Sequence, residues 1–172
     1  STFTTATNYA VTLSDTSASA ANLNTINADT TGLVTATNVT TISSSTFADV
    51  NTLISNRVIS GNAINIYNDY NVTLSDVSIS AANVKVVNND TSGTINISAA
   101  TTIISSTIAD VLEIVQNTGS VFTTATNYAV TISDATISAA NVKLINADNG
   151  TGTIDISAAT TIISSTIADV LE

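Results

Sequence analysis

The 172-residue sequence contains no histidine, cysteine, methionine, tryptophan or proline. Without cysteine the chain can form neither a disulfide nor a thiolate metal site, and it has no thiol nucleophile. Without histidine it also lacks the commonest general base and metal ligand in proteins. These absences disfavour most classes of enzyme. We therefore expect the protein not to be an enzyme and assign it no catalytic residue.

Basic residues are scarce as well. Arg57, Lys85 and Lys143 stand against thirteen acidic residues, which gives a formal net charge of −10. Nucleic acids and anionic lipids are recognised by basic patches, so neither is an expected partner. No run of about eighteen apolar residues is present, and we expect no membrane insertion. Apolar residues still make up 44% of the chain, which is enough for a folded core.

The sequence repeats itself on two scales. The pentapeptide VTLSD occurs at Val11 and Val72 and returns as VTISD at Val130, and the segment ISAATTIISSTIADVLE occurs at both Ile97 and Ile156. These matches predict three long repeats, over residues 1–61, 62–119 and 120–172. Within each repeat, SAAN alternates with TFAD or TIAD at intervals of about thirty residues, so each repeat is expected to contain two coils, with the last helix truncated.

Each recurring tetrapeptide predicts the start of a helix. A Ser or Thr N-cap accepts a hydrogen bond from the N3 backbone N–H, and an Asn or Asp at N3 can reach back toward the cap. Apolar residues at N4 and N7 then give each helix one narrow buried face, so the helices are expected to be short and docked. The six predicted caps are Ser19, Thr46, Ser80, Thr107, Ser138 and Thr166.

Runs rich in Val, Ile and Thr precede each cap and predict two short strands per coil. A coil of about thirty residues cannot bury its own apolar face, and such a repeat is typical of a solenoid. The sequence therefore predicts a single β-rich solenoid over residues 1–172. We expect a right-handed parallel β-helix-like or leucine-rich-repeat-like stack, with two short strands and one short helix per coil. The alternative is two or three tandem sandwich domains of about sixty residues.

Carboxylates are the only side chains that could serve as catalytic groups, and three residues of one turn could also bind a metal ion. Asp148, Asn149 and Asp155 surround a glycine turn and would offer the oxygen ligands that calcium prefers. Asn96 and Thr35 stand at the positions equivalent to Asp155, so a repeated site would lose charge. An ordinary turn with Asx hydrogen bonds is the alternative. We therefore expect no cofactor, with calcium as the one candidate.

Four tyrosines precede strand-like runs in the repeats. They are Tyr9, Tyr67, Tyr70 and Tyr128. Aromatic rings on a surface can stack on sugars, so carbohydrate is a candidate partner. The alternative is that these rings anchor corners of the fold against the next coil.

The segments VTLSDTSASAANLNTINADTTG and TTIISSTIADV resemble the tandem units of very large repetitive bacterial surface or secreted proteins, notably those of marine cyanobacteria. The resemblance implies an extracellular or cell-surface location, a structural or adhesive role and no active site. The leading hypothesis is therefore a structural segment of an extracellular fibre, stalk, surface layer or adhesin. The alternative is an extracellular binding module for carbohydrate or calcium.

The two ends of the sequence predict a further partner. Neither end has a polar capping repeat, which a solenoid normally requires. Only the six residues IVQNTG, found after Glu113, would be needed to lead from Glu172 into another Ser1. We therefore expect copies of the chain, or adjacent repeats, to bind through uncapped solenoid ends. The terminal Leu171-Glu172 is either native or a cloning remnant.

Overall fold

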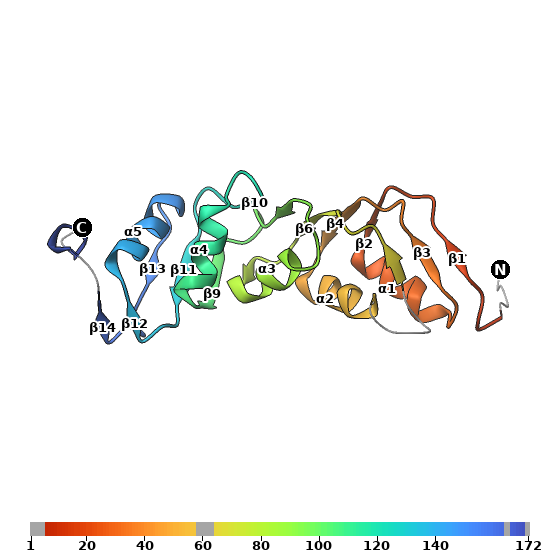
Figure 1. Ribbon diagram of the computed structural model, residues 1–172, viewed down its shortest axis with the longest axis horizontal. Coiled ribbons are helices and arrows are strands. Elements are labelled where there is room, and N and C mark those ends of the chain that lie inside the picture. The colour runs from red at the N-terminus through yellow and green to blue at the C-terminus, as the bar shows by residue number, and fades with distance from the viewer. Residues whose placement is uncertain (1–5, 58–63, 164–165, 171–172) are drawn as a thin grey trace. The chain divides into compact units, whose positions relative to one another are not determined.

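The computed structural model describes residues 6–57, 64–163 and 166–170. Within these residues, helices and short strands alternate along the chain (Figure 1). The helices are α1 (Ala20–Asp29), α2 (Phe47–Asn56), α3 (Ala81–Asn88), α4 (Ile108–Gln116), α5 (Ala139–Asp148) and α6 (Ile167–Val170). The strands are β1 (Val11–Thr12), β2 (Ser17–Ser19), β3 (Val34–Ala36), β4 (Thr41–Ser45), β5 (Ile64–Ile66), β6 (Asn71–Leu74), β7 (Ser78–Ile79), β8 (Ile95–Asn96), β9 (Thr102–Ser106), β10 (Phe122–Thr123), β11 (Ala129–Ile132), β12 (Thr136–Ile137), β13 (Ile154–Asp155) and β14 (Thr161–Ile162).

The fold is α/β, with parallel sheets that alternate with helices. Five of the described helices have eight to ten residues, whereas no described strand exceeds five. The strands belong to separate parallel sheets, and among the described residues no sheet closes or continues as a solenoid. The prediction of a β-rich solenoid, whether β-helix-like or leucine-rich-repeat-like, is therefore wrong. Antiparallel sandwich domains are not observed either, because the strand pairs described below are all parallel.

The chain divides into two compact regions. Region 1 comprises the described residues of 1–75 together with 87–95. In it, β3 lies between β1 and β5, and β4 lies between β2 and β6. Helices α1 and α2 pack against each other. The buried side chains of this region include Leu23, Val34, Ile42, Val50, Leu53, Ile64, Tyr70 and Val72.

Region 2 comprises residues 76–86 and the described residues of 96–172. The strand order in its larger sheet is β13-β11-β9-β7, and β12 pairs with β14. Helix α4 packs on α5, and α5 packs on α6. The buried side chains include Ile79, Val84, Ile97, Ile103, Val111, Ile114, Phe122, Tyr128 and Val130. Strand β8 and helix α3 lie at the boundary, with residues in both regions.

Two predictions made from the sequence are not tested by the described residues. The division into repeats 1–61, 62–119 and 120–172 stays a prediction. The terminal Leu171-Glu172 lies outside the described residues. No helix in the described part of the chain is long and apolar enough to cross a membrane.

Candidate functional site

The six predicted cap residues all lie immediately before a helix. At five of them the side-chain oxygen accepts a hydrogen bond of 3.2 Å from the backbone N–H three residues later. These five are Ser19, Thr46, Ser80, Thr107 and Thr166. Ser138 precedes α5 but makes no such bond. The cap side chains thus hold helix ends and are not arranged around a ligand.

The three threonine caps make a second contact. Each hydroxyl also donates to the aspartate at N3, as Thr107 does to Asp110 at 2.8 Å. The pKa of Asp110 lies below its usual range, chiefly because of its hydrogen bond with Lys85 and then because of Thr107. The pKa of Asp169 is lowered as well, chiefly by the Thr166 hydroxyl. The ionised form of Asp110 and of Asp169 is therefore favoured, and this form accepts the hydrogen bond of the threonine cap.

Two strand serines hold the starts of other helices. Ser45 and Ser106 are buried at the ends of β4 and β9. Their hydroxyl oxygens accept hydrogen bonds from the backbone N–H groups of Ala20, at 2.9 Å, and Ala81, at 2.8 Å. Each pair is 25 residues apart in the sequence. The bonds therefore hold the start of α1 against the end of β4 and the start of α3 against the end of β9. The buried N–H of each helix start is satisfied in this way, which avoids a large desolvation cost.

Three tyrosines form a repeated contact that we call the tyrosine–aspartate latch, defined as the pairs Tyr9–Asp29, Tyr70–Asp90 and Tyr128–Asp148. In each pair the tyrosine hydroxyl donates to the carboxylate of the aspartate twenty residues later. The oxygen–oxygen distance is 2.8 Å for Tyr70–Asp90 and 2.6 Å for Tyr128–Asp148. The aspartates lie at or just after the ends of α1, α3 and α5. Each latch therefore fixes the end of a helix to the chain before a strand.

The backbone carbonyl of a latch tyrosine also accepts a hydrogen bond from a side chain that follows the helix. The Thr91 hydroxyl donates to the Tyr70 carbonyl at 2.6 Å, and the Asn149 amide donates to the Tyr128 carbonyl at 3.2 Å. A Cβ atom placed on Gly93 would lie 2.2 Å from the Tyr70 carbonyl oxygen. Only glycine allows the two backbone segments to approach so closely.

The hydroxyls of Tyr70 and Tyr128 are held in their neutral form. Burial, and then the hydrogen bond to the aspartate, raises the pKa of the Tyr70 hydroxyl far above its usual range. The same two causes, in the same order, raise the pKa of Tyr128. In the Tyr70–Asp90 latch, Arg57 forms an ion pair with Asp90 and lies 5.9 Å from the centre of the Tyr70 ring. Because so high a pKa keeps these two phenols protonated, their hydroxyls serve as hydrogen-bond donors and not as general bases.

The candidate calcium ligands serve three different contacts. Asp148 accepts the Tyr128 latch bond, and buried Asn149 donates to the backbone of the same turn. Asp155 is exposed on β13, where its carboxylate accepts a 2.9 Å hydrogen bond from the Ser157 N–H in an Asx turn. Within residues 6–57, 64–163 and 166–170, no group of three or more acidic side chains is placed to hold a metal ion.

The four tyrosines do not present a common strip of rings. The Tyr70 and Tyr128 side chains are buried, whereas Tyr67 is 44% exposed. Tyr9 is engaged in the first latch. Stacking of all four rings on a sugar is therefore not compatible with their positions.

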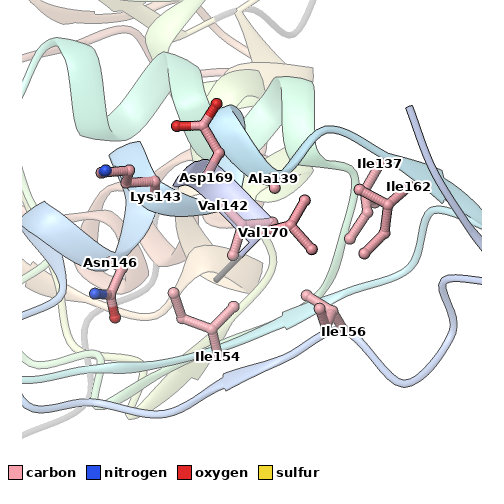
Figure 2. A pocket seen from close by; sticks show the side chains of 10 residues that line it. All are labelled: Ile137, Ala139, Val142, Lys143, Asn146, Ile154, Ile156, Ile162, Asp169 and Val170. Carbon is pink, nitrogen blue, oxygen red and sulfur yellow. The ribbon is translucent and has the colours of Figure 1, made fainter. Parts of the chain in front are cut away.

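An apolar groove of about 320 Å³ lies in region 2 (Figure 2). Isoleucine and valine side chains from β12, α5, β13, β14 and α6 surround it, with Lys143 and Asp169 along one side. The lining residues are Ile137, Ala139, Val142, Lys143, Asn146, Ile154, Ile156, Ile162, Asp169 and Val170. Six of the ten lining residues are isoleucine or valine, so the groove suits apolar side chains.

Comparison with protein-family models, with curated protein sequences and with solved structures finds no match to the chain. The similarity to tandem units of bacterial surface proteins therefore stays a prediction. Function has to be inferred from the contacts of the chain itself.

The latches and the groove were both missed by sequence reasoning. A signal for the latches was present, because a tyrosine and an aspartate recur at a constant separation of twenty residues in three places. The groove gave no local signal, since its lining has the same sequence pattern as fully buried parts of the chain.

Proposed function

We propose that the chain is a non-enzymatic structural segment in which each αβ repeat supports the next. The observation that carries this proposal is the threefold recurrence of the tyrosine–aspartate latch. A latch uses one phenol and one carboxylate to hold a helix end, so the groups best suited to acid–base chemistry or ligand binding are already occupied. A contact that recurs in this way stabilises three strand–helix units by the same means, which supports a structural role.

The strand pairing supports the same role. Strand β11 is hydrogen-bonded to β9 on one edge and to β13 on the other, and all three strands are parallel. Paired edges leave few free backbone groups for non-specific association. An acidic chain surface, with its net charge of −10, further favours solubility. The cell-surface location finds no support in the described structure and stays a prediction.

Calcium provides the sharpest test against the binding-module alternative. We expect the unfolding temperature of the chain, measured by calorimetry, to be the same in millimolar calcium and in excess chelator. The reason is that Asp148 and Asn149 are engaged in the latch turn and Asp155 in its Asx turn. A ligand that binds only the folded state would raise this temperature.

Asp155→Asn is the matched variant, because Asn96 stands at the equivalent position of the preceding repeat. A calcium-dependent rise in unfolding temperature that Asp155→Asn abolishes would overturn the structural proposal in favour of calcium binding.

A further inference from the structure

The same segment of sequence is buried in one place and exposed in another. ISAATTIISSTIADVLE occurs at residues 97–113 and 156–172. Ile103 is 1% exposed in the first copy, whereas its counterpart Ile162 is 50% exposed. Val111 is fully buried, whereas its counterpart Val170 is 54% exposed. Identical side chains thus have a covering surface in one copy and lack it in the other.

Strand β11 is one of the elements that cover the first copy of the segment, residues 97–113. Strand β11 runs parallel to β9, with Val130 opposite Ile103 and Ala129 opposite Thr102. The Ala129 N–H donates a 2.9 Å hydrogen bond to the Thr101 carbonyl. These contacts define how this segment is covered within region 2.

A second strand with the sequence of β11 is present in region 1. The heptapeptide ATNYAVT occurs at residues 6–12 and at 125–131, so β1 corresponds to β11. Strand β11 has a neighbour on both edges, whereas β1 pairs only with β3 in the described structure. Strand β14 corresponds to β9 and likewise pairs there only with β12. In the internal copy, β9 and β11 are paired with each other. In the described structure, β14 has no partner that corresponds to β11, and β1 has no partner that corresponds to β9.

The side chains in and before β1 are also more exposed than their counterparts at β11. Tyr128 and Val130 of the internal copy are buried, whereas Val11 in β1 is partly exposed. Tyr9 is partly exposed as well, although its hydroxyl is engaged in the first latch. An exposed strand edge beside apolar side chains is a site for pairing with another chain.

We propose that the groove of one copy binds residues 6–13 of a second copy. In this interface β1 lies parallel to β14, with Val11 opposite Ile162, and the Ala10 N–H donates to the Thr160 carbonyl, as Ala129 does to Thr101. The contact joins two different faces, so it is heterologous and adds copies head to tail. The inference rests on the proposed structural function and adds the partner and the register.

Sedimentation velocity of the full chain over a wide concentration range tests the proposal. The native chain should associate, and its mean mass should rise with concentration. Ile162→Glu blocks the groove, and Val11→Lys blocks β1, because each buries a charge in the proposed interface. Each variant alone should stay monomeric in the range where the native chain associates.

Mixing the two variants separates a head-to-tail contact from a symmetric one. The Val11→Lys chain keeps its groove, and the Ile162→Glu chain keeps β1, so an equimolar mixture should form dimers and nothing larger. Val77 is 64% exposed and lines no part of the groove, so Val77→Glu and Val77→Lys are the matched controls and should associate like the native chain. Circular dichroism checks folding, with Val170→Glu and Ala10→Lys as second variants for the two faces.

Three results would overturn the inference: a native chain that is monomeric at every concentration, a Val11→Lys chain that still dimerises alone, or Val77 controls that lose association equally. None of them bears on the calcium test, so failure of this inference is distinguishable from failure of the proposed function.

Discussion

Tyr128 shows how much a single residue does in this fold. Its ring is buried, its hydroxyl donates to Asp148, and its carbonyl accepts from Asn149. A Cβ on Gly152 would come within 1.8 Å of the same carbonyl oxygen. Tyr128 therefore holds the start of β11, the end of α5 and the turn after α5 together.

Removing the Tyr128 hydroxyl should destabilise the chain measurably. Tyr128→Phe leaves the Asp148 carboxylate without its 2.6 Å donor. A hydrogen bond to a charged group contributes about 1.5–3 kcal/mol, so we expect the free energy of unfolding to fall by about 2 kcal/mol in urea titrations. Tyr67→Phe is the control, because Tyr67 is largely exposed, and it should change stability by less than about 0.5 kcal/mol. Equal effects of the two variants would mean that the latch bond contributes nothing specific.

At the scale of elements, α3 and α5 begin with the same heptapeptide but different cap contacts. ISAANVK occurs at Ile79 and at Ile137. Ser80 accepts a 3.2 Å hydrogen bond from the Asn83 N–H, whereas Ser138 makes no cap bond. The φ and ψ angles of Ser138 are −106° and 132°, compared with −77° and 150° at the bonded cap Ser19. The backbone at Ser138 thus departs from that of a bonded cap, in keeping with the missing cap bond.

This difference predicts unequal effects of the same substitution. Ser80→Ala should lower the free energy of unfolding by about 1 kcal/mol, the usual value for loss of an N-cap. Ser138→Ala should change it by less than about 0.5 kcal/mol. Thermal and urea unfolding of the two variants provide the measurement. A cost at Ser138 as large as at Ser80 would show that both hydroxyls cap their helices in solution.

The helix starts could be predicted from the sequence because a cap depends on three or four consecutive residues. The short strands at the Val-, Ile- and Thr-rich runs could be predicted as well, but their lengths and their pairing could not, because these depend on distant neighbours. TTII at residues 101–104 enters β9, which pairs with β7 and β11, whereas in TTII at residues 160–163 only Thr161 and Ile162 form a strand, β14, which pairs with β12. The same letters thus give strands of different extent, depending on their neighbours. The groove could not be predicted for the same reason, because the exposure of its side chains depends on whether a neighbouring strand covers them.

At the scale of the whole molecule, charge opposes association while apolar surface favours it. The net charge of −10 makes any two copies repel each other. The proposed interface is lined mainly by isoleucine and valine. Salt screens the first effect, with a Debye length of about 10 Å at 0.1 M, and has little influence on the second.

Association should therefore become stronger as ionic strength rises. We expect the dissociation constant from sedimentation equilibrium to fall severalfold between about 0.02 M and about 0.2 M sodium chloride, because screening reduces repulsion between the acidic copies. A dissociation constant that rises with salt would indicate an interface made by ion pairs instead of apolar side chains.

The latch tyrosines also give the molecule a built-in optical probe. The chain has four tyrosines and no tryptophan, so its ultraviolet emission comes from tyrosine alone. Region 2 contains a single one, Tyr128, while Tyr9, Tyr67 and Tyr70 belong to region 1. In Tyr128→Phe chains the tyrosine emission therefore reports region 1 alone, while circular dichroism follows both regions of the same variant. Whether the two regions unfold together or one after the other can thus be read from the chain without any added label.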